Sequence, residues 1–112
     1  MPARLRVLGP DALASAEEAS DTKALVKHYL AVLEERAPGR SVEVRVPPYA
    51  AVQVVPGVRH TRGTPPAVVE TDAETWLAVA TGRTTWGEAL ASGKVLASGE
   101  RTDLSAYLPL DR

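Results

Sequence analysis

The sequence predicts an α+β fold, with about five strands in a mainly antiparallel sheet and helices packed on one face of it. A helical segment precedes a block of short apolar runs, and two further helical segments follow that block. Several runs alternate apolar and polar residues, which is typical of strands with one buried and one wet face and favours antiparallel pairing. Strands in one block, with helices grouped at either end, indicate a single sheet covered on one side.

Size and composition limit the classes of protein to consider. The 112 residues suffice for one domain with one core, which we expect to span residues 21–112. Residues 1–20 are expected to form either a loose N-terminal arm or a short helix that starts at Pro10-Asp11. A net charge of −1 gives no sequence-wide basicity, so no nucleic-acid partner is expected. The chain has no cysteine, which removes disulfides, thiol catalysis and thiolate metal sites.

The first long helix is expected at about residues 21–36. Ser20 or Asp21 suits the N-cap position. An apolar stripe at positions i, i+4 and i+8 then predicts an amphipathic helix, and it consists of Leu25, Tyr29 and Leu33.

The strands follow this helix. Pro-Pro at 47–48 and Pro-Gly at 56–57 separate the runs by turns. VRHTR, at 58–62, is either a third strand or an extended loop. The other expected strands are SVEVRV at 41–46, AAVQVV at 50–55, AVVET at 67–71 and VLAS at 95–98.

Two short helices are expected between the last two strands. Thr71 and Glu74 have the spacing of a capping box, and the helix that they begin should end at a left-handed cap on Gly82. Thr85 and Glu88 repeat the capping pattern for a second helix.

Three segments resemble, in this order, the C-terminal half of the sterol carrier protein family: ETWLAVATGR, TTWGEALASGKV and ASGERTDLSAYL. Three further segments are similar to the short bacterial branch of this family, which is common in high-GC actinobacteria: RVPPYAAVQ, RHTRGTPPAVVETD and DLSAYLPL. The resemblance covers about residues 22–110. It implies a five-stranded sheet with helices on one face. In some members these enclose an apolar tunnel for fatty acyl chains or sterols, and no catalytic residue is involved. This chain departs from the family in two ways. It ends with PLDR in place of a peroxisomal tripeptide, and it has no phenylalanine, so any tunnel would be lined differently because of that second departure.

The resemblance implies a non-enzymatic protein, without a cofactor, that binds or carries an apolar small molecule or lipid between sheet and helices. Trp76 and Trp86 either wall this cavity or simply fill the core. The expected lining residues are Leu25, Tyr29, Val44, Val52, Val54, Trp76, Val79, Trp86, Leu90, Leu104 and Tyr107.

The alternative is an interaction or regulatory module with a filled core. Related domains occur fused to thiol-dependent isomerase-like enzymes, so such a module would dock onto a partner enzyme or form a homodimer. Its mark would be an exposed apolar patch in place of a cavity. In either case we expect a cytoplasmic protein, because no apolar run approaches the roughly 18 residues of a membrane span and the N-terminus has no apolar signal segment.

Arg59, His60 and Arg62 form the densest cationic cluster. They would suit the head group of a ligand or another anion, since guanidinium groups offer paired donors. The simpler interpretation is a solvated strand face, or ion pairs with Glu70 or Asp72.

Catalytic and metal sites are poorly supported. Of the two histidines, His28 is expected at the surface beside Lys27, and neither has the ligand spacing of a zinc site. Glu70, Asp72 and Glu74 can be read as an acid/base set, but helix capping alone explains Asp72 and Glu74.

Overall fold

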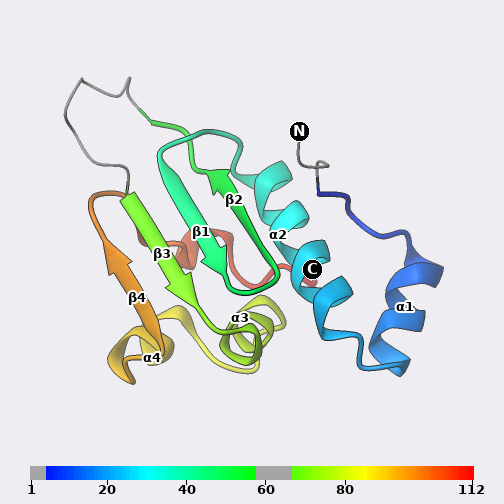
Figure 1. The fold of residues 1–112 in the computed structure, drawn as a ribbon. Coiled ribbons are helices and arrows are strands. Elements are labelled where there is room, and N and C mark those ends of the chain that lie inside the picture. Colours follow the sequence, from blue (N-terminus) through cyan, green and yellow to red (C-terminus); the bar gives the residue numbers. More distant parts are fainter. Residues whose placement is uncertain (1–4, 58–66) are drawn as a thin grey trace.

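The computed structural model describes residues 5–57 and 67–112 and has the expected α+β class (Figure 1). Within these residues, four strands form one sheet in the order β2-β1-β3-β4. In chain order the elements are α1 (Pro10–Glu18), α2 (Thr22–Arg36), β1 (Val42–Val46), β2 (Ala50–Val54), β3 (Ala67–Thr71), α3 (Ala73–Ala80), α4 (Trp86–Ala91), β4 (Val95–Ser98) and the 3-10 turn η1 (Ser105–Tyr107).

The sheet is mixed, which corrects the expectation of about five mainly antiparallel strands. β1 pairs with β2, and β3 with β4, in antiparallel fashion, but β1 and β3 are parallel. The reason is that Val42 lies between Val54, the last residue of β2, and Ala67, the first of β3. The chain therefore re-enters the sheet at the end where it left, and β3 must run opposite to β2. The possible strand at 58–62 lies outside the described residues.

One face of the sheet is buried and the other faces solvent. Val42, Val44 and Val46 of β1 are fully buried, whereas Glu43 is half-buried and Arg45 is exposed. The buried face packs against all three of α2, α3 and α4, whose core residues include Leu30, Leu33, Trp76, Val79 and Ala89. This alternation is what the strand pattern predicts for a sheet covered on one side.

The predicted helix ends are correct to within about one residue. Asp21 caps α2 by accepting from the backbone N–H of Ala24 over 3.1 Å. Thr85 caps α4 through the N–H of Glu88, and Gly82 has the left-handed φ of +77° expected after α3.

The cap of α3 differs from the expected box. Asp72 is the N-cap and accepts from the N–H of Thr75 over 2.7 Å. Thr71 is instead the last residue of β3, where it pairs with Val95 and its hydroxyl donates to the carbonyl oxygen of Lys94. Residues 10–18 form a helix, α1, that packs on the outside of α2 (Figure 1).

Candidate functional site

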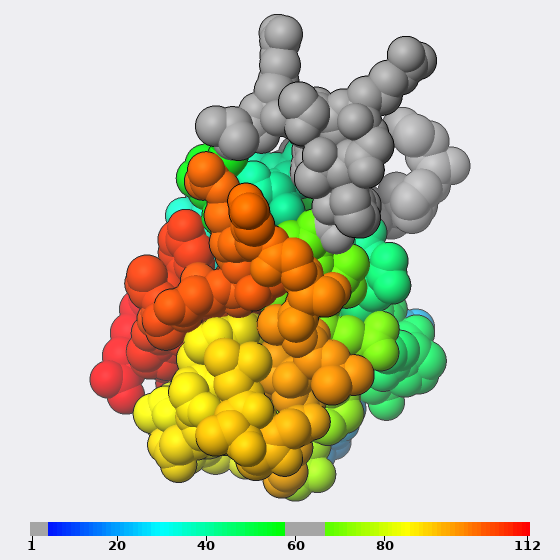
Figure 2. Space-filling view, turned by 90° about the vertical axis from the view of Figure 1, so that its left-hand side faces the viewer, coloured from blue at the N-terminus to red at the C-terminus, as the bar shows by residue number. Residues whose placement is uncertain are grey.

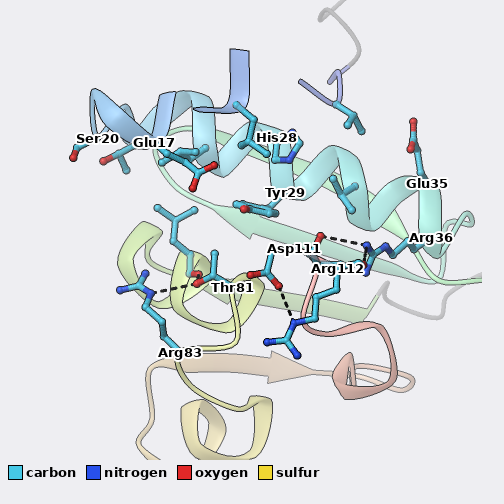
Figure 3. A pocket seen from close by; sticks show the side chains of 17 residues that line it. Glu17, Ser20, His28, Tyr29, Glu35, Arg36, Thr81, Arg83, Asp111 and Arg112 are labelled. Atoms are coloured by element: carbon cyan, nitrogen blue, oxygen red, sulfur yellow. Dashed lines mark hydrogen bonds and ion pairs between the residues drawn. The ribbon is translucent and has the colours of Figure 1, made fainter. Parts of the chain in front are cut away.

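A groove of about 960 Å³ lies beside α2, on the side turned toward α1 and the C-terminal segment (Figure 3). It is larger than the hollow of about 580 Å³ beside β2. Four separate parts of the chain form its walls: the N-terminal segment with α1, helix α2, the end of α3 and the last three residues. Its apolar lining consists of Val7, Leu13, Leu25, Tyr29, Val32, Leu77 and Leu110.

Helix α2 presents different residues to the groove and to the sheet. Leu25, Tyr29 and Val32 line the groove, and their spacing of i, i+4 and i+7 places them on one side of the helix. The helix also buries Val26, Leu30 and Leu33 completely in the core. α2 is therefore apolar over a wider arc than a helix that packs on the sheet alone.

Tyr29 connects the groove to the core. Its side chain is 4% exposed, and its ring packs edge-on against His28 with centroids 4.7 Å apart. The hydroxyl has no hydrogen-bond partner among the described residues. Burial, followed by the charges of Glu17 and Asp111, raises the pKa of Tyr29 above its ordinary value. The group is therefore a neutral donor and acceptor within reach of whatever occupies the groove.

His28 is buried, with 5% exposure, so the expectation of a surface histidine is wrong. The backbone N–H of Leu8 donates to its Nδ1 atom over 2.9 Å. Burial lowers the pKa of His28, against a smaller opposing effect of Glu17. An imidazole that accepts at Nδ1 is neutral with its proton on Nε2, so His28 serves here to attach the N-terminal segment to α2.

The rim of the groove carries charges of both signs (Figure 3). Arg36 donates to the carbonyl oxygens of Pro109 over 3.0 Å and Leu110 over 3.3 Å, and so holds the C-terminal segment against α2. Arg83 lies at the other end of the groove, where its Nε atom donates to the hydroxyl of Thr81 over 3.2 Å. Since Arg36 is engaged with the chain's own carbonyls, Arg83 is the better placed of the two to meet an anionic group.

Comparison with protein families matches residues 18–110 to the family described as bacterial SCP ortholog. The chain belongs to this family. The resemblance to sterol carrier proteins is thereby confirmed over nearly the whole domain. A search of the curated proteins gave no match.

In the structure the expected lining residues fall into three groups. Leu25 and Tyr29 line the groove. Leu90 is 40% exposed on α4, and Tyr107 is half-buried against the core. The others are buried in the core between sheet and helices, and they are Val44, Val52, Val54, Trp76, Val79, Trp86 and Leu104.

The two tryptophans are almost completely buried. Trp76 is 0% and Trp86 4% exposed, and neither indole Nε1 has a hydrogen-bond partner among residues 5–57 and 67–112. Trp86 also borders a smaller hollow of about 330 Å³ between the α3–α4 connection and the C-terminal segment. Both rings fill space between the helices and the sheet in the described structure.

The polar candidates are dispersed. Arg59, His60 and Arg62 lie outside the described residues. Asp72 caps α3, Glu74 occupies the first turn of that helix, and Glu70 lies on β3. Within residues 5–57 and 67–112, no three His, Cys, Asp or Glu side chains lie together as a metal ion would require. None of the helices in these ranges is long and apolar enough to cross a membrane.

Sequence reasoning did not single out Val32, Leu77 or Arg36 as site residues. A signal for Val32 was present, because it adds an apolar side chain beside the expected stripe of α2. No local signal marks Leu77 and Arg36, since both reach the groove only through the packing of α3 and the C-terminal segment beside α2.

Proposed function

We propose that this protein binds or carries an apolar, lipid-like ligand without transforming it, and that the ligand lies in the groove beside α2. The observation that supports this best is the apolar floor of Leu25, Tyr29 and Val32 around the unpartnered hydroxyl of Tyr29. Ligand sites are typically hollows of about 300–1,000 Å³ with a largely apolar lining and a few polar groups.

Burial of apolar surface would drive binding. An acyl chain that buries about 200 Å² of apolar surface in the groove gains about 5 kcal/mol of binding free energy at 25 cal/mol per Å². The ligand's polar end would accept a hydrogen bond from Tyr29, and a carboxylate would lie near Arg83. Arg59, His60 and Arg62 remain predicted head-group residues.

A ligand in the groove would touch Leu25 and Tyr29 directly. For it to reach the other predicted residues of the sheet–helix core, the core would have to open around Trp76. The groove requires no such rearrangement, and we therefore place the ligand there.

The test is displacement of a fluorescent fatty acid from purified protein. Val32→Trp would fill the groove and is expected to weaken probe binding by about tenfold or more, while Ala91→Trp, on the exposed face of α4, leaves it unchanged. Tyr29→Phe is expected to weaken a probe with a free carboxylate more than its methyl ester. Absence of saturable binding, or equal effects of the two tryptophan variants, would contradict the proposal.

The second candidate is a module with a filled core that docks onto a partner protein. Close packing favours it, because Val44, Trp76 and Leu104 are fully buried. Pull-down from native lysate with Val32→Trp as bait separates the two, since a docking module keeps its partner when the groove is filled.

A further inference from the structure

We infer that β4 is a self-association edge, at which two copies of this chain pair their β4 strands antiparallel into one continuous sheet. This inference is independent of the ligand groove, which lies beside α2. It depends on how the sheet ends, on which side chains lie there and on the charges at the two ends of the strand.

β4 is the last strand of the sheet, so the backbone groups along its outer side pair with no described strand. In Figure 2 it runs along the face turned to the viewer, in orange, beside α4 in yellow. The opposite edge is different: Leu5 of the N-terminal segment and Arg40 border the hollow beside β2, whereas the hollow beside β4 is lined by residues of β3, α4 and β4. β4 is therefore the more open edge of the described sheet.

Three of the four side chains of β4 are apolar, and the fourth is Ser98. Leu96 is 65% exposed, the highest value among the large hydrophobic residues described, and Leu90 of α4 is 40% exposed. Both border a hollow of about 450 Å³ along the strand. Natural edge strands commonly carry a charge, a proline or a bulge that prevents pairing, and Val95–Ser98 contains no charge and no proline.

The charges at the two ends of β4 favour a second copy of this chain as the partner that pairs with this edge. Lys94 precedes β4 and Glu100 follows it, both are exposed, and neither has an ion-pair partner among the described residues. They lie three residues before and three residues after Ala97, and Glu100 follows a bend at Gly99, whose φ is +92°. Antiparallel pairing about a twofold axis at Ala97 would bring Lys94 to the partner subunit's Glu100, twice. It would also place Leu96 diagonal to the partner's Leu96, and cross-strand pairs of both kinds are stabilising.

The experiment is sedimentation equilibrium of the full chain over a range of concentrations. A four-residue strand pair is a small interface, so we expect a reversible dimer with a Kd of about 100 µM. Leu96→Lys should weaken dimerisation by about tenfold or more. Gln53→Lys introduces the same charge at an exposed position of β2 and should leave it unchanged. Val32→Trp should also leave it unchanged, which separates this inference from the groove.

A charge exchange tests the register. Lys94→Glu and Glu100→Lys should each weaken the dimer, and the double variant should restore it. A monomer at every concentration up to about 1 mM, a dimer indifferent to Leu96→Lys, or a double variant that stays as weak as the single variants would overturn the inference.

Discussion

The backbone N–H of Leu8 donates a 2.9 Å hydrogen bond to Nδ1 of His28, which joins the N-terminal segment to the buried side of α2. The bond requires that Nδ1 be unprotonated. Because Leu25, Tyr29 and Val32 of α2 line the groove together with Val7 and Leu13, this contact also sets one wall of the proposed ligand site.

His28 should make stability depend on pH. Burial lowers its pKa below the ordinary 6.5, so the unfolded chain takes up a proton before the folded one as pH falls. Stability is then complete above about pH 6.5 and declines below it. His28→Phe should cost about 1 kcal/mol at neutral pH through the lost hydrogen bond, and should flatten the dependence of the unfolding free energy on pH.

The measurement for His28 is urea unfolding from pH 8 to pH 5, with Lys27→Ala as the control. Parallel pH profiles for the wild type and His28→Phe would show that another group is responsible.

The shifted cap of α3 predicts different costs for two adjacent residues. Asp72 accepts from both the N–H and the hydroxyl of Thr75, so Asp72→Ala should destabilise the protein by about 1–2 kcal/mol. Thr71→Val removes only the bond to the Lys94 carbonyl and keeps the β-branched shape, so its cost should be about 1 kcal/mol. Thermal unfolding followed by circular dichroism gives both values, and a larger cost for Thr71→Val would place the cap at Thr71.

Trp76 is expected to be a packing residue in the ligand-free protein. Trp76→Ala should cost about 3–5 kcal/mol, because it leaves a cavity in the closed core. Leu90→Ala, at a 40% exposed position, should cost less than about 1 kcal/mol. Similar unfolding free energies for the two variants would indicate that Trp76 lines a hollow.

Arg36 is expected to hold the C-terminal segment. Arg36→Ala removes the donors to the Pro109 and Leu110 carbonyls and should increase amide exchange in residues 108–112. The backbone bond of 2.7 Å from Leu110 N–H to Ala80 should persist but open more often. Hydrogen exchange with mass spectrometry measures this, and Glu35→Ala, on the next residue of α2, is the control. Unchanged exchange would assign the attachment to the Ala80 bond alone.

Local sequence patterns predicted the fold class, the positions of α2, α3 and α4, and the positions of the four described strands. Thr85 and Glu88 form the predicted cap because it depends only on two residues three positions apart in the sequence. Thr71 did not, because the same side chain also suited a strand end, where the Lys94 carbonyl became its partner. Such competition is decided by a residue 23 positions away.

The sheet order and the groove depend on packing between distant segments. The parallel pairing of β1 with β3 depends on where the chain returns after β2, which no local pattern encodes. Leu25 and Tyr29 were expected to line a cavity between sheet and helices, and in the structure they line the groove beside α2. Leu77 and Arg36 were not predicted as site residues, since their position beside α2 and the C-terminal segment follows only from the assembled fold.

The most direct test of the proposed ligand site is the measurement of intermolecular NOEs between isotope-labelled protein and an unlabelled medium-chain fatty acid. We predict contacts from the acyl methylenes to the ring of Tyr29 and the methyl groups of Leu25 and Val32. NOEs to Val44 and Trp76 instead would place the ligand inside the sheet–helix core, and the absence of any NOE under saturating conditions would contradict lipid binding by this protein.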